Sequence, residues 1–185
     1  MNVWTVKANL HPDNDDRGWH WNGYFFEGHS GKRWGGPDWI RSNASIRHIR
    51  EHVRKDDLVV CYQTDDREII GLTQMASNGG VSPSSGKFDL LDFVGCRRAF
   101  VIKPPLRIKD LRKLGCHPEC FENGTQGTVF PVYQHEFCGI IAAMIQLSPD
   151  QEKPLLRWLR NAGWRWTAPK SHQLVSKVTG KAERS

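Results

Sequence analysis

Two apolar runs on either side of a short acidic turn constrain the fold more than any other part of the sequence. Residues 58–63 read LVVCYQ and residues 69–75 read IIGLTQM, with Asp65 and Asp66 between them. Short apolar runs separated by turn-forming residues are typical of a β-hairpin. Gly71, inside the second run, predicts a bulge or the close approach of another backbone. The sequence therefore predicts two antiparallel strands at these positions.

Strands and short helices are interleaved along the rest of the chain. Further strands are predicted at 3–9, 92–102 and 128–133. Pro104 and Pro105 are expected to end the second of these strands, and Pro131 to place the third at a sheet edge or bulge. Helices are predicted at 45–53, 106–114, 136–147 and 148–163. Because the strands are joined by hairpins rather than long crossovers, we expect an α+β fold, a mixed or antiparallel β-barrel flanked by short helices.

Residues 10–44 lose this regularity. They hold six glycines, two prolines and four tryptophans. A long irregular segment in a compact domain is usually functional or disordered, and so many aromatic residues argue against disorder. Residues 33–43 read RWGGPDWIRSN, which sets Trp34 and Trp39 around a Gly-Gly-Pro-Asp turn. We expect Trp34 to stack on a ligand and Trp39 either to pack in the core or to join the site.

A short basic helix is predicted directly after this segment, at 45–53, with Asn43 or Ser45 as its cap. Its apolar and basic residues separate onto two faces at helical spacing: Ile46, Ile49 and Val53 on one, Arg47, Arg50 and Arg54 on the other. Charges of this kind are typical of a solvated helix face. Arg47 and Arg50, near the helix start, could also hold a phosphate.

The chain of 185 residues suits one domain, and its net charge of +6 favours an anionic partner. No apolar run approaches the roughly 20 residues of a membrane helix, and the start of the chain does not resemble a signal peptide. We therefore expect a cytoplasmic protein (nuclear in a eukaryote) with reduced cysteines and no membrane partner.

Metal and catalytic motifs are weak. Cys116, Cys120, His135 and Cys138 have a loosely zinc-like order, but the spacing is imperfect and Cys138 opens an apolar run where a free cysteine packs well. The motifs of zinc proteases, serine hydrolases and dinucleotide-binding folds are missing. We therefore expect no metal, no cofactor and no catalysis.

The order of several pieces resembles the EVE domain, a member of the PUA-like superfamily related to the YTH domain. The pieces are VWTVKAN, then W-G-x-x-x-x-R-S-N, a short basic helix, DLVVCYQ with IIGL, and finally GTVFPVYQHEFCGIIAAM. The resemblance covers residues 3–147. It implies one PUA-like domain over residues 1–166, and we expect the remaining 167–185 to be a basic, disordered tail.

The resemblance implies a β-barrel with flanking helices that binds nucleic acid and accepts one modified base in a pocket. YTH domains read methylated adenine in RNA, and EVE domains are implicated in reading modified bases in DNA. The implied partner is therefore DNA or RNA, with a nuclease or a base-modifying enzyme as a further candidate partner.

The resemblance also implies which residues form the pocket. They would be Lys7 and Asn9 at the end of the first strand, Trp34 as a cage ring, Arg41, Ser42 and Asn43 at the mouth, and Tyr62 and Gln63 at the end of the next strand. The loop that carries a second cage tryptophan in YTH domains has none here, so Phe88, Trp21 or Trp39 would form the opposite wall. Stacking one base contributes about 1–3 kcal/mol and flipping it costs a few, so two walls and edge contacts are needed.

Two other functions compete with base reading. An enzyme could use the same cavity, with His20, His29 or Cys61 as acid, base or nucleophile, and would show a perturbed histidine or cysteine beside a carboxylate. A small-molecule or protein interaction module would instead show a filled cavity and an exposed apolar patch.

Overall fold

The structure is a computed structural model that describes residues 1–10, 18–26, 33–37, 43–81, 88–122 and 127–165. For 33–37, 43, 81 and 88–90 it describes the backbone alone. The tail expected at 167–185 lies outside these residues.

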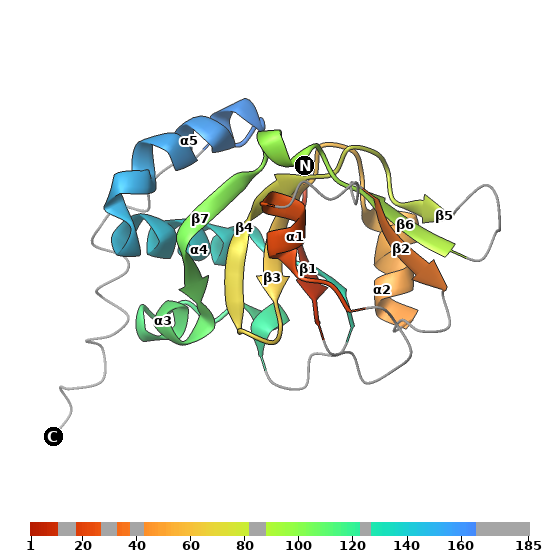
Figure 1. Ribbon diagram of the computed structural model, residues 1–185, viewed down its shortest axis with the longest axis horizontal. Helices are drawn as coiled ribbons and strands as arrows, with labels where there is room; N and C mark the ends of the chain where they lie inside the picture. The colour runs from red at the N-terminus through yellow and green to blue at the C-terminus, as the bar shows by residue number, and fades with distance from the viewer. Residues whose placement is uncertain (11–17, 27–32, 38–42, 82–87, 123–126, 166–185) are drawn as a thin grey trace, which may run out of the picture.

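A five-stranded mixed sheet forms the centre of the molecule, in the order β7-β4-β3-β1-β8 (Figure 1). Its strands are β1 (Val3–Ala8), β3 (Leu58–Gln63), β4 (Glu68–Gln74), β7 (Phe100–Arg107) and β8 (Val129–Pro131). Strands β1 and β3 are parallel, and every other pair is antiparallel. The hairpin predicted from the two apolar runs is confirmed as β3 and β4.

A second, three-stranded sheet has the order β2-β6-β5. It consists of β2 (Arg33–Pro37), β5 (Gly80–Val81) and β6 (Phe88–Asp92). An isolated bridge between Met75 and Phe93 links it to the central sheet. The predicted α+β class is confirmed, but closure of a barrel is not shown: among the described strands, the edges β7 and β8 do not pair with each other.

Short helices surround the sheets. They are α1 (Trp21–Phe25), α2 (Asn43–Arg47), α3 (Ile108–Lys113), α4 (Gln134–Leu147) and α5 (Glu152–Asn161). Helix α2 continues without a break into one π-helical segment, η2 (His48–His52). The described ranges also contain three single turns of 3₁₀-helix: η3 (Cys96–Arg98), η4 (Glu119–Phe121) and η5 (Pro149–Gln151). In the described part of the chain, none of these helices is long and apolar enough to cross a membrane.

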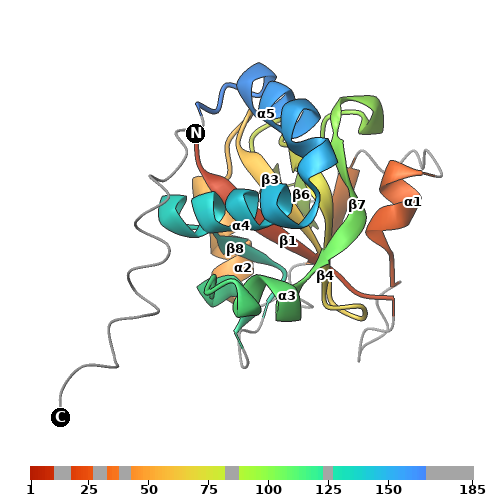
Figure 2. The same ribbon diagram turned by 90° about the vertical axis from the view of Figure 1, so that its left-hand side faces the viewer.

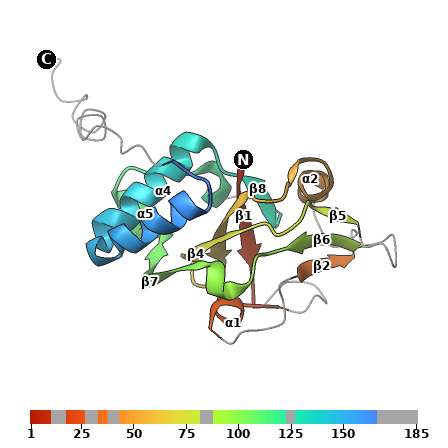
Figure 3. The same cartoon turned by 90° about the horizontal axis from the view of Figure 1, so that it is seen from above.

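The two faces of the central sheet are covered differently (Figures 2 and 3). Helices α3, α4 and α5 cover one face, here called the helix face, where the contacts are mainly aliphatic. Helix α1, the α2–η2 helix and the second sheet cover the other, here called the aromatic face, around Trp4, Trp21, Tyr24, Phe25 and Phe93. The strand predicted at 3–9 is confirmed as β1, and its residues alternate between the two faces: Val3 packs on the helix face and Trp4 and Val6 on the aromatic face.

The prediction of one strand at 92–102, ended by two prolines, was wrong. Strand β6 ends at Asp92, the η3 turn follows, and β7 then belongs to the other sheet. Pro104 and Pro105 lie inside β7, between two paired stretches, where the register shifts. The fold tolerates them because β7 is an edge strand, and an edge strand can accommodate residues without an N–H group.

Two further expectations are corrected. Residues 10–44, expected to be irregular, contain α1 and β2. Ser45 does not cap the basic helix; its hydroxyl accepts hydrogen bonds from the N–H groups of Thr128 (2.9 Å) and Val129 (3.2 Å), which attaches the helix to β8. The close approach predicted at Gly71 is confirmed, because a Cβ there would lie 2.5 Å from the Phe100 carbonyl oxygen.

Candidate nucleic-acid interface

The α2–η2 helix presents a row of arginines to solvent. Ile49 and Val53 are fully buried against the aromatic face. Arg47 and Arg50 are exposed on the opposite side of the helix. Arg54 is exposed just after the helix ends, where its guanidinium donates to the carbonyl oxygens of Glu51 and Val53. The amphipathic pattern read from the sequence is confirmed for the helix, and the three guanidinium groups have the chemistry that binds phosphate.

A hydrogen-bonded group under the end of this helix fixes it to β1. The buried Asp57 carboxylate accepts from Trp4 Nε1 (2.9 Å) and from the Arg54 N–H (2.9 Å). The His48 ring lies 5.4 Å from the Trp4 ring. Burial, together with the nearby His52 and Arg47, lowers the pKa of His48, so the imidazole is neutral at the base of a cationic surface.

Strands β2 and β6 place two predicted site residues in one sheet. Trp34 pairs with Leu91, and Pro37 with Phe88, so Trp34 and Phe88 lie on adjacent strands three positions apart. Asn43 is the first residue of α2, six positions after the end of β2 in the sequence. The side chains of all three lie outside the described part, as do Trp39, Arg41 and Ser42 entirely.

Residues expected to face one cavity from the ends of β1 and β3 are divided between the two sheet faces. Lys7 and Tyr62 point to the helix face: the Lys7 ammonium lies 4.5 Å from the centre of the Phe130 ring, and the Tyr62 ring 4.8 Å from that of Phe121. Burial lowers the pKa of Lys7. Gln63 points to the aromatic face, because neighbouring residues of a strand alternate. The expectation that Tyr62 and Gln63 share a cavity was therefore wrong.

Trp21 and Gln63 hold helix α1 in place. The Trp21 ring is fully buried and donates from Nε1 to the Val6 carbonyl oxygen (3.2 Å). The Trp21 N–H donates to Gln63 Oε1 (3.1 Å), and Gln63 Nε2 donates to Asp65 (2.7 Å). Neither ring face of Trp21 is open to a base in this arrangement. Asn9 lies beside them, where its carbonyl oxygen accepts from the N–H of Trp19 (2.9 Å).

The residues considered for catalysis have structural roles where they are described. His20 Nδ1 accepts from the Asn22 N–H (2.9 Å), and its Nε2 lies 2.8 Å from an Asp66 carboxylate oxygen, so both ring nitrogens are engaged. Cys61 is fully buried, and burial raises the pKa of its thiol well above the ordinary value. A buried thiol of this kind is a poor nucleophile. His29 lies outside the described residues.

The zinc-like cysteines do not assemble a metal site. Cys120 is buried and Cys116 packs against α4, where its sulfur would lie 2.5 Å from a Cβ at Gly139. Within the described ranges, no group of three or more His, Cys, Asp or Glu side chains could hold a metal ion. Burial raises the pKa of Cys116 to about 11, which favours the thiol over the thiolate that binds metals.

A groove with a volume of about 640 Å³ lies between the N-terminus, the end of β8 and the start of α4. Its walls include Trp4, His52, Tyr133 and Trp164. Among the side chains that the structure describes, none of the predicted base-binding residues lines it: Lys7, Asn9, Trp21, Arg47, Tyr62 and Gln63 all lie elsewhere.

No family model and no curated protein matches the sequence, whereas several solved structures resemble its fold. Human THYN1, solved in complex with DNA that contains 5-methylcytosine, has a TM-score of 0.57 and 14% identity over 78% of this chain and 98% of that chain. A protein of Agrobacterium tumefaciens has a TM-score of 0.56 and 16% identity over 89% and 94%. The DUF55 domain of human thymocyte nuclear protein 1 has a TM-score of 0.54 and 10% identity over 77% and 98%.

The chain has an EVE-like fold. The EVE-like arrangement expected from the sequence is thereby confirmed at the level of the fold, while closure of the expected β-barrel is not shown. At these identities the likeness concerns the fold and carries no individual residue from those proteins to this one.

Sequence reasoning missed a second basic surface. Its members are exposed on η3 and on one stripe of α5: Arg97, Arg98, Lys153, Arg157 and Arg160. The first two were placed in a strand, where alternate side chains are buried. The i, i+4, i+7 spacing of Lys153, Arg157 and Arg160, opposite Leu155 and Leu159, was the available signal.

Proposed function

We propose that this protein is a nucleic-acid-binding module without catalysis of its own. The observation that carries the proposal is the exposed arginine row of the α2–η2 helix, on a fold like that of THYN1, which was solved with 5-methylcytosine DNA. Arginine pairs with phosphate through two parallel hydrogen bonds, and phosphate contacts supply most of the affinity of such proteins.

The distribution of charge supports the same partner. At the α3 end of the molecule, cations lie beside carboxylates: Arg107 beside Glu68 (3.2 Å), Arg112 beside Glu122 (3.5 Å) and Lys113 beside Asp110 (3.1 Å). Over the described ranges, no carboxylate lies within 4.0 Å of a side-chain nitrogen of Arg47 or Arg54. Arg47 and Arg54, on the α2–η2 side, therefore differ from the cations at the α3 end in having no carboxylate partner among the described residues.

We further propose that a modified base enters a pocket walled by Trp34, with Trp39 opposite. The position of Trp34 supports a site there, because β2 holds its backbone in a sheet, paired with β6, and the basic α2–η2 helix is the next described element of the chain. The sharing of the fold with THYN1 makes 5-methylcytosine the first modification to test. Trp21, Tyr62 and Gln63 are left out of this pocket because they are buried in the core.

Fluorescence anisotropy tests both parts of the proposal, nucleic-acid binding and recognition of a modified base. The protein is titrated with duplex and single-stranded oligonucleotides, with unmodified cytosine and with 5-methylcytosine. We expect Arg47→Gln to weaken binding to every probe by a similar factor, since a phosphate contact carries no sequence information. We expect Trp34→Ala to reduce the preference for the modified probe, with a loss of about 1–3 kcal/mol.

Lys109→Gln is the matched control for Arg47→Gln, because Lys109 is an exposed cation on α3, away from the proposed interface. Its affinity should equal that of the parent. No binding of the parent to any probe at low salt would refute the function. Equal affinity for modified and unmodified probes would remove base reading and leave nucleic-acid binding in place.

A further inference from the structure

The η3 turn and helix α5 form one basic surface, here called the η3–α5 face, which consists of Arg97, Arg98, Lys153, Arg157 and Arg160. The indole Nε1 of Trp158 donates to the Arg98 carbonyl oxygen (2.7 Å), and its ring lies 6.4 Å from that of Phe100 at the start of β7. These contacts hold the turn against the helix. Figure 1 shows both along the upper edge of the molecule.

All five cations of the η3–α5 face are exposed. Two exposed carboxylates, Asp150 and Glu152, border the face, but neither pairs with it: among the described residues, no carboxylate oxygen lies within 4.0 Å of these five cations. The face therefore carries an excess of positive charge that the protein itself does not neutralise.

Stability does not account for such a cluster. Like charges at close range repel one another, and exposed cations gain little from their own protein. The buried residues of α5, Leu155 and Leu159, lie on the opposite side of the helix from Lys153, Arg157 and Arg160. An external polyanion is the partner that this surface fits.

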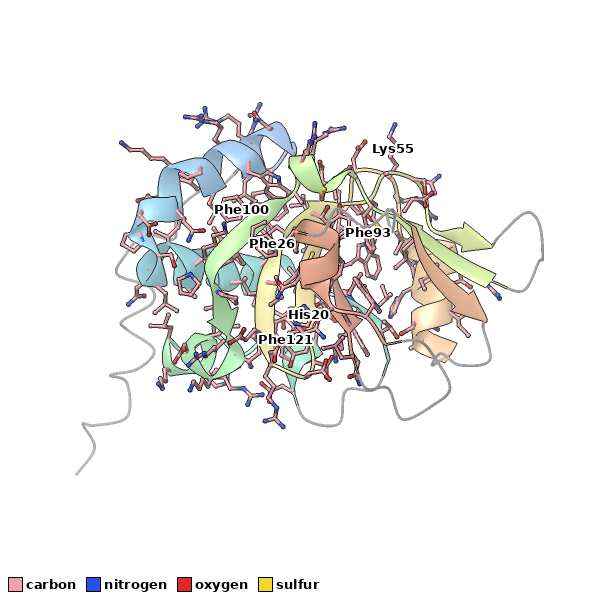
Figure 4. The ribbon with its side chains drawn as sticks, in the orientation of Figure 1. His20, Phe26, Lys55, Phe93, Phe100 and Phe121 are labelled. Carbon is pink, nitrogen blue, oxygen red and sulfur yellow. The ribbon has the colours of Figure 1, made fainter. Side chains whose placement is uncertain are left out.

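The face continues toward the arginine row already described. Gln74 Nε2 donates to the carbonyl oxygens of Ala162 (3.1 Å), after α5, and of Asp56 (3.2 Å), after η2, which links the ends of the two helices. Lys55, the residue before Asp56, projects outward on the same upper side (Figure 4). The hydrogen bonds of Gln74 thus connect the end of the α2–η2 arginine row with the end of α5.

We propose that the η3–α5 face is a second phosphate-binding surface that holds the backbone of the nucleic acid beyond the part bound at α2–η2. This inference rests on the nucleic-acid binding proposed above. It concerns affinity and the length of nucleic acid covered, because phosphate contacts position a protein without reading sequence.

The test compares the salt dependence of binding in the parent and in the double variant Arg97→Gln, Arg98→Gln. Each lost phosphate contact lowers the slope of log affinity against log salt by about 0.9. For two lost contacts, the affinity ratio between about 50 and 200 mM salt should shrink about twelvefold. The change should be equal for modified and unmodified duplexes. Lys109→Gln, Lys113→Gln, which removes the same charge from α3, should leave the slope unchanged.

Each outcome decides the inference. If the parent binds a long duplex and the Arg97/Arg98 variant has the same slope and affinity, the second surface is refuted while the proposed function stands. If the parent binds no nucleic acid, both fail. If the parent binds polyglutamate as tightly as DNA and the variant loses that binding, the face serves an acidic protein, and the inference is overturned. Circular dichroism and thermal melting show that each variant is folded.

Discussion

The helix face of the central sheet is covered by segments that follow one another along the chain, whereas the aromatic face is covered by segments gathered from two distant stretches. Helices α3, α4 and α5 lie within residues 108–161. The aromatic face takes α1, β2 and the α2–η2 helix from the first third of the chain, and β5 and β6 from residues 80–92.

The chemistry of the two faces differs in the same way. Side chains such as Leu111, Ile140, Ile141, Leu155 and Leu159 fill the helix face, while a cluster of rings joins the parts of the aromatic face. Trp21 lies within 6.0 Å of the rings of Tyr24, Phe25 and Phe93. Both elements that carry the candidate base site, β2 and α2, belong to the aromatic cover. The difference shows that the candidate site is built on the part of the fold that depends on ring packing between distant segments.

Truncation of one large buried side chain on each face should give the largest loss of stability. It also tests whether the two faces open separately. Trp21→Ala should cost about 3–5 kcal/mol and Leu159→Ala about 2–5 kcal/mol, because both side chains are fully buried. Urea unfolding measures each cost. Hydrogen exchange should then accelerate around α1 and β6 in the first variant and around α4 and α5 in the second. The same exchange pattern in both variants would mean that the two faces open as one unit.

The stability of the protein at alkaline pH tests how the Tyr24 hydroxyl is held on the aromatic face. Its hydroxyl donates to the Val94 carbonyl oxygen and lies 3.2 Å from Thr73 Oγ1, and burial raises its pKa to about 12. An unfolded chain loses the same proton near pH 10, so stability should fall as the pH rises from about 10 to 12. Tyr24→Phe should lose about 1–3 kcal/mol at neutral pH, because a buried acceptor is left unpaired, and should show a flatter alkaline slope.

The exposed Tyr133, before α4, is the control for Tyr24. Tyr133→Phe should leave the alkaline slope of the unfolding free energy as it is in the parent. Parallel slopes for the parent and Tyr24→Phe would show that the Tyr24 hydroxyl is not held in the way described.

The smallest expected effect on stability concerns His48, which lies beneath the candidate interface on the aromatic face. Its pKa is lowered by burial, so below the ordinary value of 6.5 the unfolded chain takes up the proton first. Stability should therefore fall as the pH drops below about 6.5, and the fall should be smaller in His48→Gln. Urea denaturation at neutral and mildly acidic pH measures the change in unfolding free energy for the parent and the variant. An exposed histidine, His135→Gln, serves as the control and should keep the slope of the parent.

Much of the fold could be predicted because its signals are local. The hairpin of β3 and β4, the alternation of β1 and the buried helix α4 each follow from a short pattern of apolar residues and turns. The pairing of β1 with β3 joins residues 55 positions apart, such as Val3 and Leu58, and β2 pairs with β6 at a similar separation. No local pattern encodes such partners, which is why β2 was read as irregular chain.

The candidate site shows the same limit. The arginine row of α2–η2 could be read from helical spacing, and so could the burial of Ile49 and Val53. The assignment of Lys7, Tyr62, Gln63 and Trp21 to one pocket failed because strand residues alternate between faces and because Trp21 is needed to attach α1. The prolines of β7 were read as a strand end, since the sequence alone does not reveal that the strand lies at a sheet edge.

Hydrogen–deuterium exchange of the parent protein, with and without a duplex that contains 5-methylcytosine, tests the central claim most directly. The account predicts slower exchange on DNA binding in the α2–η2 helix, and in η3 and α5, with α3 unchanged. Protection centred on α3, or no change anywhere at a DNA concentration that saturates binding, would contradict it.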